Sequence, residues 1–215
     1  DIILDDSAIL KNICLQNSKS SGYFHKYSKN KLSTQSNLTS FIFPTGLKFN
    51  KLDLEINLEG ERSECNLQSA SFLNNNEHQE VKTRVNHLFP NCKSYQKVKN
   101  VLTADSKGVY QGKIFVKDVA QKTDAYQLSK AILLSEGSEF DSKPELEIYA
   151  DDVKCSHGSA SGSLNEDSIF YLMSRGLSYQ QSRELLINGF LLDVVEKITD
   201  SEIKNLIKNM IGIKE

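Results

Sequence analysis

Cys155 and His157 are the two residues of this chain whose types and spacing point most directly to chemistry. Residues i and i+2 of an extended strand point to the same face, so a strand here places the thiol and the imidazole side by side. Sulfur and imidazole nitrogen are ligands for iron, zinc and copper. Spacing alone favours the commoner alternative, a small buried cysteine beside a capping histidine. One cysteine and one histidine are also too few for a complete cluster site, so we expect another chain to supply further ligands.

Three other groups of residues could carry chemistry, and each has a simpler structural interpretation. Asp151 and Asp152 could act as paired carboxylates in glycoside cleavage. Adjacent strand residues point to opposite faces, however, and two aspartates more simply cap a turn. His78 and His87 could meet as metal ligands across a turn. It is more common, however, for one such histidine to be exposed and the other to lie at the edge of a packed face. The glycine-rich segment 158–162 lacks the lysine of a phosphate-binding loop, which predicts no nucleotide site on this chain.

The segments around this pair have the pattern of strands. Apolar and polar residues alternate with period two in segments 51–58 and 81–87, which predicts half-buried strands. Strands without intervening helices can form a sandwich, a barrel or a parallel β-helix, and no fixed repeat decides among these folds. The apolar positions Leu146, Ile148 and Ala150 are even-numbered, whereas Val153 and Cys155 are odd-numbered. This change of face predicts a bend at Asp151–Asp152.

Composition divides the chain into three expected regions. Residues 1–37 are polar and are expected to be irregular, residues 38–162 should form the strands, and residues 163–215 should form a helical region. Capping residues mark the expected helix starts: Asn165, and the pairs Ser178 with Gln181 and Thr199 with Glu202. The expected apolar side of the second helix comprises Leu185, Leu186, Phe190, Val194 and Ile198.

Charge and cysteine content restrict the function further. The 215 residues carry a formal net charge of -2, so no overall basic field indicates nucleic-acid binding. Cys14, Cys65, Cys92 and Cys155 include no C-x-x-C pair, and we expect reduced thiols in a cytosol-like compartment. No stretch approaches the ~18 apolar residues of a membrane span. The sequence begins at Asp1 without methionine, so we expect a fragment of a longer protein.

Four motifs occur in one order in the second half of the chain. They are VYQGKI at 109–114, AQKTDA at 120–125, KPELEIYADDVKCSHG at 143–158 and FYLMSRG at 170–176. With these motifs, the chain over roughly residues 81–198 resembles the SufB/SufD family of scaffold subunits in SUF iron–sulfur cluster assembly, and within it the C-terminal part of SufD. The resemblance implies a mainly β fold, a right-handed parallel β-helix followed by a small C-terminal α-helical domain.

The resemblance also implies roles for residues and partners. In the family, the histidine at the position of His157 lies at the interface with the SufB subunit. His157 is therefore the main candidate for an iron ligand or proton acceptor, and Cys155 is the second. The implied cargo is iron or a nascent iron–sulfur cluster shared with SufB. The family's helical region contacts the SufC ATPase, which handles the nucleotide. The candidate contact residues are Tyr171, Arg175, Leu186 and Phe190.

These implications describe a scaffold and not an enzyme, in the cytoplasm or, in a eukaryote, the plastid stroma. Two alternatives stay open, a SufB-like paralogous subunit and a carbohydrate-active β-helix enzyme. The absence of tryptophan gives the second no preferred aromatic platform for sugars. An exposed β-helix edge also favours pairing with a second copy, so a homodimer is a further possibility.

Overall fold

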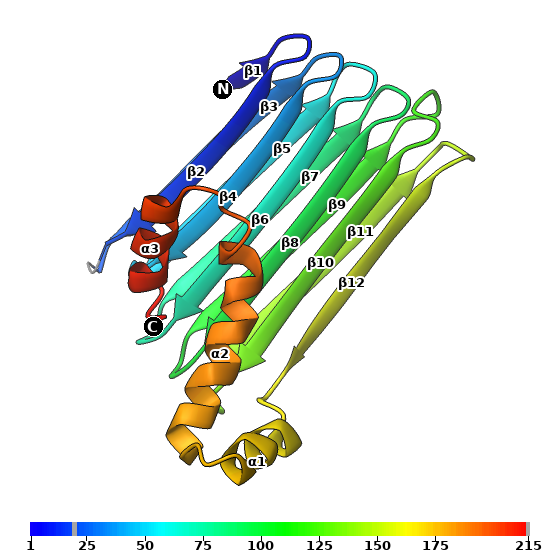
Figure 1. Cartoon of the computed structure of the whole chain (residues 1–215). Helices are drawn as coiled ribbons and strands as arrows, with labels where there is room; N and C mark the ends of the chain where they lie inside the picture. Colours follow the sequence, from blue (N-terminus) through cyan, green and yellow to red (C-terminus); the bar gives the residue numbers. More distant parts are fainter. Residues whose placement is uncertain (19–20, 214–215) are drawn as a thin grey trace.

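A parallel β-helix forms most of the molecule, and three α-helices follow it (Figure 1). The computed structural model describes residues 1–18 and 21–213. Within them, strands with odd numbers form one sheet and strands with even numbers form a second. The odd-numbered sheet contains β1 (Ile2–Leu4), β3 (Tyr23–Leu32), β5 (Phe49–Leu58), β7 (His78–His87), β9 (Lys107–Val116) and β11 (Glu139–Ile148). The even-numbered sheet contains β2 (Ile9–Asn17), β4 (Asn37–Thr45), β6 (Glu64–Leu73), β8 (Lys93–Leu102), β10 (Asp124–Leu133) and β12 (Lys154–Gly162).

Each turn of the β-helix contributes one strand to each sheet, and all the strand pairs are parallel. Paired residues lie 26 to 32 positions apart in the sequence. Glu64, Lys93, Asp124 and Lys154, for example, lie in one row across four strands. The prediction of a β-helix followed by helices is confirmed. The variable repeat length explains why no fixed period is visible in the sequence.

The corners between odd- and even-numbered strands share a backbone conformation and a hydrogen bond. A residue with positive φ occurs at five of these corners: Ser7, Gln35, Arg62, Asn91 and Lys122. The residue that follows it stabilises the turn, as when the Ser63 hydroxyl donates to the Gly60 carbonyl at 2.8 Å. Cys92 has the equivalent place at the next corner, and its thiol donates to the same carbonyl at 3.2 Å. Cys92 is therefore a structural residue.

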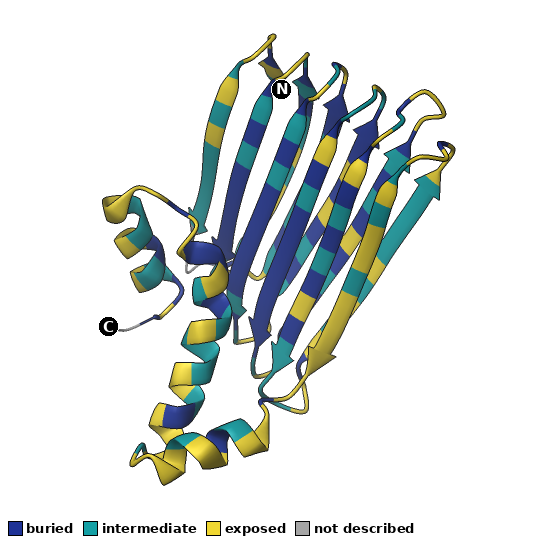
Figure 2. Cartoon of the chain, turned by 45° about the vertical axis from the view of Figure 1, so that its right-hand side comes forward, coloured by how far each residue is buried: buried dark blue, intermediate teal, exposed yellow. Residues whose placement is uncertain are grey.

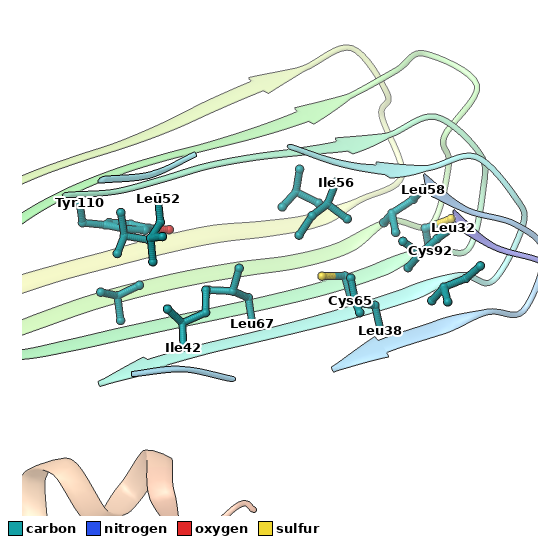
Figure 3. Close-up of a cluster of buried hydrophobic side chains, with 14 residues drawn as sticks. Leu32, Leu38, Ile42, Leu52, Ile56, Leu58, Cys65, Leu67, Cys92 and Tyr110 are labelled. Carbon is teal, nitrogen blue, oxygen red and sulfur yellow. The ribbon is translucent and has the colours of Figure 1, made fainter. Parts of the chain in front are cut away.

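Apolar side chains from both sheets fill the interior. They include Leu38, Ile42, Leu52, Ile56 and Leu67, each at most 3% exposed (Figure 3). Complete burial of such a side chain contributes about 1.5–3 kcal/mol. Burial of the inward side chains thus holds the two sheets together. Because side chains alternate along each strand, the other half lie on the outer faces.

The expectation of an irregular segment at residues 1–37 is wrong. Strands β1, β2 and β3 lie within it, and β3 pairs with β5 over ten positions. Inward positions of β3 carry Lys26, Ser28 and Asn30, so the apolar alternation that marks a strand is missing. Hydrogen bonds between backbones do not depend on the side chains, and pairing with the apolar β5 supplies the order that the local sequence does not indicate.

The three helices are α1 (Glu166–Ser174), α2 (Tyr179–Val195) and α3 (Ser201–Met210). Asn165 caps α1, and Ser178 with Gln181 forms the predicted capping box of α2. The third predicted cap is wrong by one residue. Asp200, not Thr199, is the N-cap of α3, because its carboxylate accepts the Ile203 N–H at 2.9 Å.

The second half of α2, together with α3, packs on the outer face of the even-numbered sheet, whereas α1 extends beyond it (Figures 1 and 2). The shared core contains Phe41, Phe43, Ala70, Val101, Leu191, Val194, Val195, Ile198, Ile207, Ile211 and Ile213. The expected apolar side of α2 is therefore only partly right. Val194 and Ile198 are buried, but Ile198 lies after the helix and Leu185 is 51% exposed.

Candidate functional site

Cys155 and His157 lie on β12, at the end of the even-numbered sheet. Cys155 pairs in register with Ala125, and His157 pairs with Gln127. Both of these partners are buried inside the β-helix, so Cys155 and His157 occupy inward positions of the last turn. The expectation that a strand places them on one face is confirmed. Within the described residues no strand covers β11 or β12 from the far side, so this turn, the terminal rung, leaves its inner face open.

The bend predicted at Asp151–Asp152 forms the corner of the terminal rung. The Asp152 carbonyl accepts the Lys122 N–H at 2.6 Å, and the Asp152 N–H donates to Gln121 Oε1 at 2.9 Å. Both aspartates are exposed. These bonds favour the turn interpretation over an acid–base pair, and they fix the point at which the chain enters β12.

Cys155 and His157 have different surroundings. Cys155 is half-buried against the apolar cluster of Ile114, Val116 and Ala125. Burial, and then the charge of Asp124, raise the pKa of its thiol. His157 is exposed, and its ring has no hydrogen bond or ion pair with any residue that the structure describes. The imidazole is thus free to bind a ligand, whereas the thiol is held protonated until a cation or metal approaches.

The strand opposite, β11, contributes mainly apolar groups to the open face. Phe140, Pro144 and Leu146 occupy inward positions and are only partly buried. The Ser129 hydroxyl connects the two sides, because it lies 2.7 Å from Ser142 Oγ and 3.1 Å from Ser159 Oγ. The terminal rung therefore presents the apolar inward side chains of β11, a thiol, an imidazole and two unpaired strand edges on one surface.

A buried polar layer, not found by sequence reasoning, lies below His157. The Tyr110 hydroxyl donates to Gln127 Oε1 at 3.1 Å, and Gln127 Nε2 donates to the Glu145 carbonyl at 3.3 Å. Burial raises the pKa of Tyr110 to about 12, so this phenol stays a hydrogen-bond donor. A Cβ at Gly112 would overlap both Gln127 Oε1 and Tyr110 Oη. The sequence gives one indication of this layer. Gln127 lies two residues from both Ala125 and Ser129, so alternation along the strand places it on the same inward face as these two residues.

His78 and His87 do not form a shared site. They lie at opposite ends of β7, where His78 is 3.0 Å from Glu80 Oε1 and His87 Nε2 is 2.8 Å from Ser94 Oγ. Burial lowers the pKa of His87 to about 3, so this imidazole is neutral. Across the described ranges, no three His, Cys, Asp or Glu side chains converge as metal ligands.

Three of the four predicted contact residues of the helical region lie together. Tyr171 and Leu186 line a hollow of about 410 Å³ between α1 and α2. Arg175 lies beside it, with its guanidinium 5.2 Å from the Tyr171 ring centre and one N–H donating to the hydroxyl at 3.3 Å. Phe190 lies elsewhere, against β8, where Lys99 Nζ is 4.5 Å from its ring centre. Leu185 also lines the hollow, and α1 and α2 carry three further exposed aromatic or apolar residues, Phe170, Met173 and Tyr179.

None of the helices within the described part of the chain has the length and apolarity required to cross a membrane.

Comparison with known proteins gives one consistent result. Residues 1–190 match the model of the family described as "SUF system FeS cluster assembly, SufBD core domain". The chain is 33% identical over 190 residues to the iron–sulfur cluster assembly protein SufD of Escherichia coli, covering 87% of this chain and 45% of that protein. It is 29% identical over 210 residues to the chloroplastic protein ABCI7 of Arabidopsis thaliana, covering 97% of this chain and 44% of that protein.

The Plasmodium falciparum protein named SufD is 28% identical over 155 residues, which cover 71% of this chain and 10% of that protein. The chain thus spans less than half the length of these curated relatives. The family match includes the β-helix, α1 and the first part of α2. Since it extends over most of the sequence, the chain belongs to the SufB/SufD core family of SUF iron–sulfur cluster assembly proteins.

Proposed function

We propose that this chain is a SufD-type scaffold part of an iron–sulfur cluster assembly complex, and not an enzyme. The observation that carries the proposal is the terminal rung, whose open inner face combines the accessible imidazole of His157 with the Cys155 thiol and two unpaired strand edges. Bacterial and chloroplastic relatives fit a cytoplasmic or plastid setting.

The first proposed partner is a SufB-type β-helix subunit that adds strands to the edges of β11 and β12. Unpaired backbone groups at such edges favour pairing with another strand. The partner would cover the half-buried Leu146 and Phe140 and bring further ligands to His157. A second copy of this chain is the competing occupant of the same surface.

Iron or a nascent cluster is the proposed cargo. The imidazole of His157 would bind iron through a ring nitrogen or accept a proton from an incoming thiol. Cys155 would take part as a thiolate only after proton loss, which burial disfavours. His157 is therefore the primary residue, and Cys155 is secondary.

A SufC-type ATPase is the second proposed partner, and it would bind at the α1–α2 hollow. The hollow has an apolar floor that includes Leu186, and it is flanked by Tyr171 and Arg175, residue types that often anchor interfaces. Phe190 would support this surface indirectly by fixing α2 to β8.

Co-expression with SufB- and SufC-type subunits tests the proposal. The wild-type chain should co-purify with both subunits and with iron and sulfide. His157→Ala should preserve the complex and lower iron and sulfide several-fold. His25→Ala is the matched control, because His25 is exposed on the odd-numbered sheet, far from β12 in the strand order, and pairs with Asp53. Unchanged iron and sulfide in the His157→Ala complex would contradict the proposed site.

Exchange of Leu186 for Asp should remove the ATPase-type subunit while leaving the SufB-type subunit bound. Loss of both subunits together would contradict two separate docking surfaces.

A further inference from the structure

A basic hollow of about 300 Å³ lies on the outer face of the odd-numbered sheet, across the β-helix from the helices. Four cationic side chains line it: Lys82 and Arg84 from β7, Lys113 from β9, and Lys143 from β11. The strand register places Lys82, Gln111 and Lys143 in one row. Arg84, Lys113 and Glu145 form the next row. These rows are two residues apart on strands separated by about 4.8 Å, so the side chains surround one point.

The positive charge of this hollow is only partly compensated. Lys143 Nζ lies 2.7 Å from Glu145, and Lys113 Nζ lies 2.5 Å from Glu147. Lys82 and Arg84 have no carboxylate within ion-pair distance in the described part of the chain. Arg84 uses only Nε, which donates to Asn86 Oδ1 at 3.1 Å, and its terminal N–H groups stay available. The four lining cations, counted against Glu145 and Glu147 as the carboxylates that form ion pairs with them, thus leave two positive charges without an ion pair.

The carboxylates beside the hollow respond to this charge. Lys143 lowers the pKa of Glu145, and Lys113 and Lys82 add to the effect. Lys113 and the Tyr149 hydroxyl lower the pKa of Glu147. Lys82 and Arg84 also line a second hollow of about 230 Å³, where the strand register places Asp53 and Glu55 beside them.

Those two carboxylates are engaged with other groups. Asp53 lies 2.7 Å from His25, and Glu55 lies 2.8 Å from the Tyr27 hydroxyl and 3.4 Å from Lys29. They therefore do not neutralise Lys82 and Arg84 at ion-pair distance.

We propose that the basic hollow binds the phosphate group of a small molecule. A phosphate dianion matches the two positive charges that lack an ion pair, and a guanidinium can hold two of its oxygens at once. The volume is at the small end of ligand sites, which suits a phosphate group and not a large cofactor. A carboxylate carries one charge and would leave the second cation uncompensated. The site lies on the outer face of the odd-numbered sheet, away from the inner face of the terminal rung and from the α1–α2 hollow, although Lys143 and Glu145 belong to β11.

Titration of the ¹⁵N-labelled full chain with inorganic phosphate and with pyrophosphate tests the proposal. Ionic strength is held constant with chloride. Amide shifts should concentrate on β7, β9 and β11, and pyrophosphate should bind more tightly than phosphate. The double variant Lys82→Gln/Arg84→Gln should weaken pyrophosphate binding at least about tenfold, which corresponds to about 1.4 kcal/mol. Lys143→Gln should weaken it by a smaller factor.

The matched control is Lys11→Gln/Lys117→Gln, which removes two exposed lysines that have no ion pair within the described residues. Its affinity should change less than twofold, and its circular dichroism should match that of the hollow variant. Equal weakening in both double variants would show a general charge effect and overturn the site. Amide shifts that chloride alone reproduces would also overturn the site. So would amide shifts that an acidic peptide causes and pyrophosphate does not.

Discussion

Removal of the Asp193 charge is expected to loosen the attachment of the helices to the β-helix. Asp193 lies on α2, and its carboxylate is 3.0 Å from Lys97 Nζ and 2.6 Å from Lys99 Nζ, both on β8. The two lysine side chains are only 10% and 9% exposed. Asp193→Asn leaves both of these cations without a counter-charge at the sheet surface.

The pKa shift sets the size of the effect. The two lysines lower the pKa of Asp193 from 3.8 to about 2, with the Lys99 hydrogen bond as the largest cause. At about 1.4 kcal/mol per unit the shift corresponds to about 2.5 kcal/mol. Because the Asp193 side chain is 45% exposed, solvent screening reduces this to about 1 kcal/mol. Two nearly buried lysines without a counter-charge add a cost of about 1 kcal/mol. The variant should therefore lose about 2 kcal/mol.

Amide hydrogen exchange measures this loss where it should occur. A loss of about 2 kcal/mol speeds exchange about thirtyfold if local opening controls it. The increase should occur in α3 and in the second half of α2, with no change in β5 to β9. Glu196→Gln is the matched control, since Glu196 also binds two lysines but at a more exposed place, and its effect should be smaller.

The pH dependence has a definite sign. The folded-state pKa of Asp193 is depressed, so its contribution is complete above about 3.8 and is lost as pH falls through about 2. The difference between wild type and Asp193→Asn should therefore shrink over that interval. Equal exchange at neutral pH, or a difference that persists at the lowest pH, would refute the reasoning.

Other substitutions and reagents test the core and the terminal rung. Gly112→Ala should destabilise the chain by about 2 kcal/mol in urea unfolding because it overpacks the buried polar layer. Gly189→Ala meets open space on α2 and should instead stabilise it by about 0.5–1 kcal/mol, so similar losses at both positions would contradict this packing argument. Iodoacetamide should modify Cys155 before Cys65, because burial raises the pKa of Cys65 to about 12. Mass spectrometry of the peptides measures the order of modification, and earlier modification of Cys65 would contradict this reasoning. His87, with its pKa lowered to about 3 from 6.5, stabilises the fold fully above about 6.5 and progressively less as pH falls toward 3. His87→Gln should flatten that slope, and an unchanged slope would show that other groups cause it.

Sequence patterns located the parts of the fold that repeat locally. The alternation at 51–58 corresponds to β5, with Leu52 and Ile56 inside, and the change of parity at Asp151–Asp152 is the corner before β12. Both features depend only on residues that are neighbours in the chain, so they can be predicted from one amino-acid sequence. The placement of His157 on an inward face of the last turn also follows from local alternation.

Features that depend on distant residues could not be predicted in the same way. Lys26 occupies an inward position of β3 only because β3 pairs with β5, 26 positions along the chain. Gln127 and Tyr110 bond inside the core, although both residue types are common on surfaces. Phe190 was a candidate for the ATPase contact or its support, and its position against Lys99, where α2 folds back onto β8, could not be predicted from the sequence. In each case, contact across the sheets decides the environment of the side chain.

The interior rows of the β-helix indicate which partner the terminal rung needs. Ile56, Val85, Ile114 and Leu146 form one continuous apolar row, and only Leu146 lacks a neighbour on one side. The next strand should thus present an apolar side chain opposite Leu146 and a metal-binding group opposite His157. A second copy that paired antiparallel with β12 would place its Ser159 opposite His157 if the pairing centred on Gly158, and its Cys155 there if the pairing centred on Ser156. Hydroxyl groups are weak ligands for iron compared with thiolates, so only a partner strand that places a cysteine opposite His157 would complete a thiolate–imidazole pair at this rung.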